Sequence, residues 1–118
     1  GIKMDYPTAE PLKSRSNNPV KNQIVITGYN QHGNKDSSMA TTQYKLFQSY
    51  DSKIAIIETD PMGEDILYLD PKYYNYSVTT SKYLHKFLLE NYIPISTREY
   101  ENVKDLIKNN IAQFKDLN

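Results

Sequence analysis

The sequence predicts an α+β fold in which an antiparallel β-meander of three to four strands is followed by two helices packed on one face. Three observations predict it. Four runs of β-branched or alternating apolar residues occur between residues 23 and 69. A turn sequence, Asp60-Pro61-Met62-Gly63, joins two of these runs tightly enough for a hairpin. After Tyr76 the apolar residues recur at helical spacing, and strands followed by helices are typical of α+β domains.

Composition limits the classes of function. The chain has 118 residues, which suits one domain, and its 14 basic and 14 acidic residues disfavour a polybasic nucleic-acid module. Cysteine is absent, which excludes disulfide frameworks, thiolate zinc sites and thiol nucleophiles. Two histidines offer little for a metal site, so we expect neither a metal nor another cofactor. A mean hydropathy of -0.71 without a long apolar run argues against a membrane span.

The first residues differ in composition from the rest. Residues 1–22 are expected to form an extended or flexible N-terminal arm, and residues 23–118 a single α+β domain. The arm combines three prolines with a cluster of Ser and Asn, which buries too little apolar surface to offset its ordering entropy. Residues 1–3 precede Met4 and are interpreted as an addition before the natural start. Without a signal peptide or cysteine, a cytoplasmic location is favoured.

Four strands are expected in the first part of the domain. Residues 23–29 contain three adjacent β-branched residues, and residues 41–50 alternate between two faces. Residues 53–58 form a continuous apolar run, joined to the preceding strand by Asp51-Ser52 as a hairpin. Residues 66–69 form the last strand, which Asp70-Pro71 closes because proline cannot donate to a ladder.

Two helices are expected in the second part. The first covers about residues 79–91, with candidate N-caps among Ser77, Thr79 and Thr80. The second covers about residues 97–115, because Ser96 and Glu99 match a capping box. Its expected apolar face contains Tyr100, Val103, Ile107, Ile111 and Phe114, with Leu106 beside it.

The titratable residues contain no catalytic pattern. Asp60, Glu64, Asp65 and Asp70 surround the last hairpin, and they suit a cation site, a catalytic carboxylate pair or, as is more usual for turns, solvated carboxylates. Their spacing does not match a calcium loop. The two histidines, His32 and His85, belong to no motif, and phosphate loops, dinucleotide fingerprints and zinc motifs are absent. We therefore predict a protein that is not an enzyme.

The most unusual segment is Lys72-Tyr73-Tyr74-Asn75-Tyr76. Three tyrosines in four positions cannot all face one core, and exposed tyrosine is enriched at binding surfaces. Nearby lysines add positive charge, a combination that also holds single-stranded nucleic acid. Packing of the tyrosines, protein binding and nucleic-acid binding all remain open. The predicted partner-binding residues are Lys72, Tyr73, Tyr74, Tyr76, Lys82 and Lys86.

Several short segments carry a resemblance. Residues 47–55 contain an aromatic-x-Ser-Tyr pattern and an Ile-Ala pair, Leu69-Asp70 ends a strand, and residues 76–82 read Tyr-Ser-x-Thr-Thr-x-Lys before Phe87-Leu88. Across residues 44–90 the chain resembles a group of small uncharacterised proteins of bacteriophages and mobile elements. The resemblance implies a phage or an integrated element as the source, and it implies no catalytic residue.

These observations lead to one functional hypothesis and one alternative. The hypothesis is a non-enzymatic phage accessory protein that binds a host or defence protein in the host cytoplasm, with inhibition of a defence nuclease as one form. The alternative is a nucleic-acid-binding accessory protein. A homodimer is left open, and a membrane partner is not expected.

Overall fold

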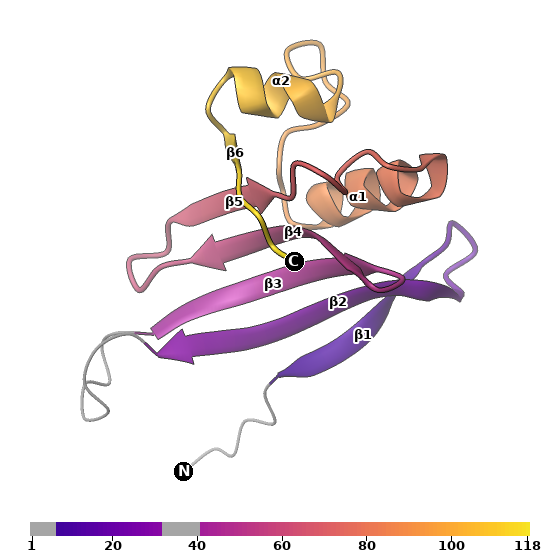
Figure 1. The fold of residues 1–118 in the computed structure, drawn as a ribbon, viewed down its shortest axis with the longest axis horizontal. Helices are drawn as coiled ribbons and strands as arrows, with labels where there is room; N and C mark the ends of the chain where they lie inside the picture. Colours follow the sequence, from indigo (N-terminus) through magenta and orange to yellow (C-terminus); the bar gives the residue numbers. More distant parts are fainter. Residues whose placement is uncertain (1–6, 32–40) are drawn as a thin grey trace.

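The computed structural model describes residues 7–31 and 41–118, which form one sheet and two helices (Figure 1). The six strands lie side by side in chain order, and neighbours are antiparallel except for the parallel last pair. The helices are α1, Val78–Glu90, and α2, Val103–Lys108. The strands are β1 (Thr8–Lys13), β2 (Pro19–Gln31), β3 (Thr41–Ser49), β4 (Ser52–Thr59), β5 (Asp65–Leu69) and β6 (Ala112–Phe114).

The α+β class is confirmed, but the sheet has six strands rather than the predicted three to four. The four central strands, β2 to β5, are those that the sequence predicted, and the Asp60–Gly63 turn joins β4 to β5. Gly63 has a φ of 86° in this turn, a conformation that residues with a side chain rarely adopt. The two additional strands, β1 and β6, lie at the two edges of the sheet.

β1 comes from the segment that was predicted to be an arm. Thr8 pairs with Thr27 and Pro11 with Ile24, while Leu12 is buried in the core. An edge strand tolerates Pro11 because only one side of it needs to donate to a neighbour. The sheet therefore begins at Thr8, and the domain boundary predicted at residue 23 falls inside β2. The interpretation of residues 1–3 concerns a part of the chain outside the described residues.

β6 comes from the segment that was predicted to be the second helix. The prediction of a helix over residues 97–115 was wrong, since α2 covers only Val103–Lys108. Asn110 ends it with a φ of 59°, and Ile111 N–H then donates to the Leu106 carbonyl in a Schellman-type ending. The capping box is made by Asn102 and Asp105 rather than by Ser96 and Glu99.

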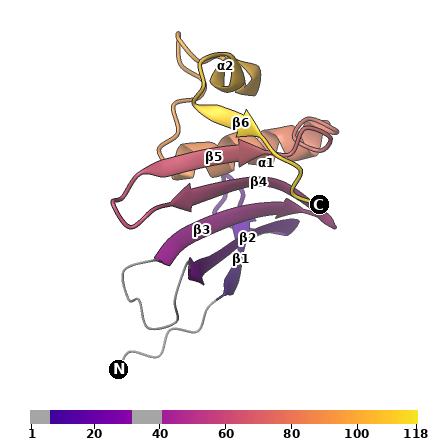
Figure 2. The same ribbon diagram turned by 60° about the vertical axis from the view of Figure 1, so that its left-hand side comes forward.

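α1 packs on one face of the sheet, and α2 lies beyond the β6 edge (Figures 1 and 2). Ser77, one of the three candidate N-caps, caps α1 by accepting a hydrogen bond from Thr80 N–H. The rings of Phe47 on β3 and Phe87 on α1 stack with centroids 5.7 Å apart. Leu84, Phe87 and Leu88 are fully buried, so one side of α1 packs in the hydrophobic core.

Candidate functional site

The side of α1 that faces away from the sheet carries exposed apolar residues. Val78, Lys82, His85 and Leu89 follow one another at spacings of four, three and four residues, which places them on one side of the helix. Val78 is 87% exposed and Leu89 is 52% exposed. We call these four residues the outer stripe of α1.

Three hollows surround the outer stripe, and His85 lines all of them. The α2-side cavity has a volume of about 310 Å³ and lies between α1 and the start of α2. The tyrosine hollow has a volume of about 650 Å³ and includes Tyr76, Val78 and Lys82. The basic groove, of about 400 Å³, separates α1 from the β1–β2 turn. His85 is thus the residue of the stripe that all three hollows share.

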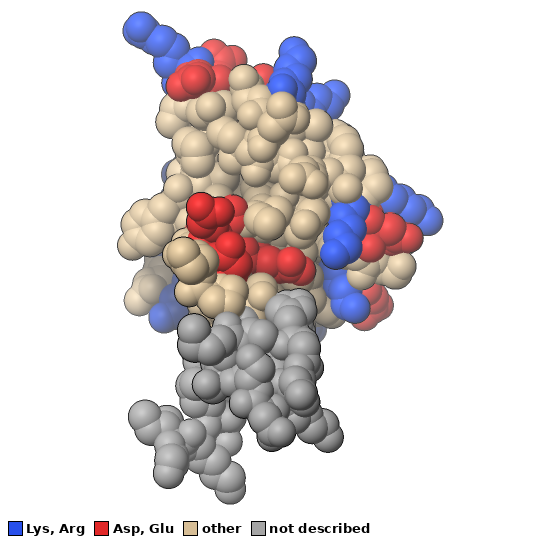
Figure 3. Space-filling view, turned by 90° about the vertical axis from the view of Figure 1, so that its left-hand side faces the viewer, with Lys and Arg blue, Asp and Glu red and all other residues tan. Residues whose placement is uncertain are grey.

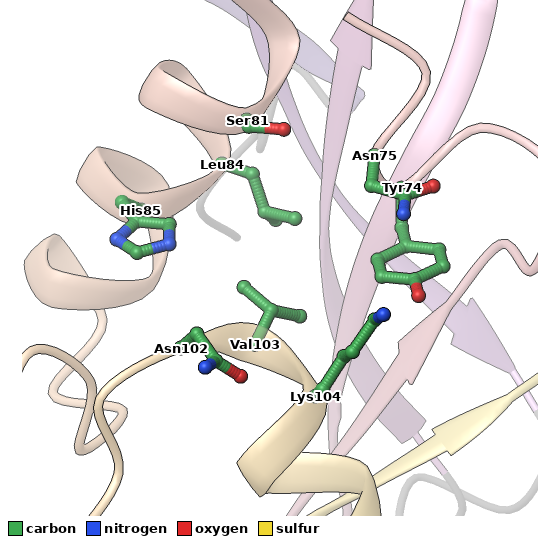
Figure 4. Close-up of a pocket in the computed structure, with 8 residues that line it drawn as sticks. All are labelled: Tyr74, Asn75, Ser81, Leu84, His85, Asn102, Val103 and Lys104. Atoms are coloured by element: carbon green, nitrogen blue, oxygen red, sulfur yellow. The ribbon is translucent and has the colours of Figure 1, made fainter. Parts of the chain in front are cut away.

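The α2-side cavity has an apolar floor and a polar rim (Figure 4). Leu84 of α1 and Val103 of α2 face each other across it, and both are buried. Lys104 extends from α2 toward the Tyr74 ring, while His85 lies on the opposite side. This arrangement suits a small apolar group better than a reacting polar one.

The predicted tyrosines separate into packed and exposed members. Tyr73 and Tyr74 are half-buried against the core, and the Tyr74 ring lies 5.3 Å from the Phe114 ring. Tyr76 is 46% exposed, and its ring meets the Tyr73 ring edge-on at 5.7 Å. Lys72 lies at the surface with its Nζ 5.2 Å from the centre of the Tyr73 ring. Tyr76 is therefore the tyrosine of this segment that is available to a partner.

A buried carboxylate holds the tyrosine segment in place. Asp70 Oδ1 accepts hydrogen bonds from the backbone N–H groups of Lys72 and Tyr73, while Oδ2 accepts from Leu117 N–H and Asn118 Nδ2. Burial raises the pKa of the Asp70 carboxyl, whereas these four hydrogen bonds to the carboxylate lower it. The hydrogen bonds outweigh the burial, so the pKa lies below its ordinary value. Asp70 thereby connects the end of β5 with the last residues of the chain.

The predicted lysines of α1 belong to the basic groove. Lys82 is exposed, with its Nζ 5.3 Å from the centre of the Tyr83 ring. Lys86 Nζ donates a hydrogen bond to the backbone carbonyl of Lys13, which holds the β1–β2 turn beside α1. Lys13 and Arg15 complete the groove. The sequence prediction missed these two because they lay in the presumed arm, although the first 50 residues carry more basic than acidic side chains.

The acidic residues gather elsewhere. Figure 3 shows Asp and Glu side chains together on the end of the molecule where β4 and β5 are connected. Asp60 Oδ1 accepts hydrogen bonds from the N–H groups of Met62 and Glu64, each 2.9 Å long, so its carboxylate forms the turn. Asp70 lies at the other end of β5 and does not join this group. Within the described ranges no three His, Asp or Glu residues are placed to hold a metal ion, and His32 lies outside those ranges.

The fold and the surface around α1 define a small α+β protein with a single sheet and one largely uncovered helix face. The chain belongs to DUF8033, a protein family of unknown function, whose model matches residues 10–103. The matched region runs from β1 to the first residue of α2 and contains the whole outer stripe. No curated protein and no solved structure matches the chain. Neither helix of the described part is long and apolar enough to cross a membrane.

Proposed function

We propose that the protein is a non-enzymatic binding module and that its partner is another protein, which contacts the outer stripe of α1. The observation that carries the proposal is the exposure of Val78 and Leu89 on a helix whose opposite side is already buried in the core. Contiguous exposed apolar surface is typical of interaction sites, and Val78 and Leu89 are proposed to form the two ends of such a surface. Lys82 and His85 lie between these two residues and add polar groups, and protein interfaces typically combine apolar and polar side chains.

Tyr76 extends the proposed interface beyond α1. Its ring borders the tyrosine hollow together with Val78 and Lys82. A large, half-exposed ring next to a hollow is the arrangement in which tyrosine contributes most to binding, because it buries area with little loss of conformational entropy. The interface is therefore proposed to run from Tyr76 along the stripe to Leu89.

Nucleic-acid binding is the second candidate, and the basic groove favours it. Against it, single strands are held largely by stacking on free aromatic faces. The basic groove itself offers little for stacking, because Tyr83 is the only tyrosine in its described lining and Lys82 lies over one face of that ring. The chain as a whole has no net charge, which leaves little long-range attraction for phosphates. Protein binding is therefore the better supported of the two.

The biological setting is also a proposal. The sequence pattern of residues 47–55 and 76–82 resembles phage and mobile-element proteins, and small proteins of that origin commonly act on host or defence proteins. We propose such a partner, with inhibition of a defence nuclease as the specific form to test.

The test uses one apolar residue inside the stripe and one outside it. Val78 is the first residue of α1, where an acidic side chain favours the helix, so Val78→Asp places a charge in the interface without weakening the fold. Met62→Asp is the matched control, because Met62 is 88% exposed in the distant β4–β5 turn. The partner is first captured from nuclease-treated host cells, and its affinity for each purified variant is then measured.

We expect Val78→Asp to weaken binding by at least about tenfold and Met62→Asp to leave it within about twofold. Equal effects of the two variants would place the interface elsewhere. Loss of all capture after nuclease treatment would favour the nucleic-acid alternative.

A further inference from the structure

The basic groove is assembled from three separate parts of the chain. Lys13 ends β1, Arg15 lies in the β1–β2 turn, and Lys82 and Lys86 lie one turn apart on α1. The hydrogen bond from Lys86 Nζ to the Lys13 carbonyl joins the two walls. The groove therefore depends on the tertiary structure, because its cationic side chains come from β1, the β1–β2 turn and α1.

The charge of the groove is uncompensated. Its lining contains four cationic side chains and no carboxylate, and none of the four forms an ion pair within the described residues. Glu10 and Glu90 line a neighbouring hollow that shares Lys13 with the groove. Like charges held together at the edge of a low-dielectric body repel one another, and an anion entering the groove would relieve that repulsion.

We propose that the basic groove receives an acidic segment of the partner protein, with its carboxylates among Lys13, Arg15, Lys82 and Lys86. This proposal rests on the proposed function and specifies the chemistry of the partner. The positive charge of the groove favours an anionic ligand, and the apolar residues at its rim favour a peptide. Two apolar residues, Tyr83 and Leu89, line the groove beside its cationic side chains. A peptide that carries apolar side chains next to its carboxylates would therefore match both parts of the groove.

A phosphodiester chain matches the groove less well. Its bases would need free ring faces, and Lys82 already lies over one face of the only tyrosine ring that lines the groove among the described residues. Ser14 and Ser16 line the groove as well, and their hydroxyls are potential donors for an anionic group of either kind. The acidic peptide is thus the occupant that both the charged and the apolar parts of the groove favour.

The test uses the full chain and two probes, a hexaglutamate peptide and an oligothymidylate of equal charge. Binding is followed by NMR chemical shifts at low and at physiological ionic strength. The variant is Arg15→Glu combined with Lys82→Glu, because both side chains are exposed and neither makes a hydrogen bond within the described residues. The control is Lys53→Glu combined with Lys108→Glu, which changes the net charge equally but lies outside the groove.

We expect saturable binding of hexaglutamate, with shifts confined to the groove, that weakens with salt. The groove variant should reduce the affinity at least about tenfold, and the control less than about threefold. Equal losses in the two variants, or shifts spread over all surface lysines, would overturn the proposal. Tighter binding of the oligothymidylate to the same residues would also overturn the proposal. So would sedimentation data in which the wild type self-associates and the groove variant does not, because the occupant of the groove would then be a second copy of this chain.

This titration needs no natural partner, so its outcome is independent of the capture experiment. If hexaglutamate fails to bind while Val78→Asp still weakens partner binding, the proposed function stands and the acidic partner does not. If hexaglutamate binds while Val78→Asp has no effect on the partner, the groove is an anion site and the outer stripe is not the interface.

Discussion

Ser49 on β3 and Thr80 on α1 are joined by a buried hydrogen bond between their hydroxyl oxygens, 2.9 Å apart. Both residues are fully buried, and the bond ties the first turn of α1 to the end of a central strand. They belong to the two segments, 47–55 and 76–82, that carry the resemblance to phage proteins. Ser77 in the second segment caps the helix, so much of that pattern is accounted for by the attachment of α1.

The first prediction concerns this hydrogen bond. Ser49→Ala should lower the free energy of unfolding by about 1–3 kcal/mol, because it leaves the Thr80 hydroxyl buried without its partner. Adding Thr80→Val should recover part of the loss, since no unpaired hydroxyl then remains. Urea denaturation of the two single variants and the double variant measures the coupling. Simple additivity would show that the hydroxyls do not interact.

The second prediction concerns Asp70 and pH. The folded pKa of this carboxyl lies below its unfolded value of about 4, so its stabilising effect is present above that pH and is lost as the pH falls through the folded pKa. Asp70→Asn should therefore destabilise the protein by about 1–3 kcal/mol at pH 7. The difference from the wild type should shrink at pH 3, measured by urea denaturation at both values. A difference that does not change with pH would show that the charge of the carboxylate is unimportant.

The third prediction separates two neighbours in α2. Leu106 is fully buried in the core, whereas Ile107 is only partly buried against it. Leu106→Ala should therefore cost about 2–5 kcal/mol of unfolding free energy, and Ile107→Ala clearly less. Thermal and urea denaturation check the order. A larger loss for Ile107→Ala would mean that α2 is rotated relative to the described packing.

The fourth prediction separates two tyrosines of the binding segment. Tyr76→Ala should weaken partner binding by about 1–2 kcal/mol and change the Tm little, because the ring is half exposed. Tyr74→Ala should lower the Tm, because its ring packs against the core and Phe114. Affinity and Tm are measured for both variants with the purified partner. A fall in Tm as large for Tyr76→Ala as for Tyr74→Ala would remove Tyr76 from the proposed interface.

Local chemistry was enough to predict the central part of the molecule. The Asp60–Gly63 turn forms because proline presets one backbone angle and Gly63 accepts a positive φ. α1 begins where Ser77 offers a capping oxygen, and its apolar spacing identifies the side that faces the sheet. Each of these signals operates within a few residues, so a single sequence contains it in full.

The edges of the sheet and the basic groove depend on contacts between distant segments. The sequence of β1 is polar and rich in proline, which is typical of a flexible arm. It forms a strand only because its backbone hydrogen-bonds to the edge of β2. The three residues of β6 continue an apolar helical pattern, yet Asn110 ends α2 and the free edge of β5 pairs with Ala112–Phe114. In the same way, Lys13 meets Lys86 only in the folded chain, because no local pattern records which residues far apart in sequence will come to share a surface.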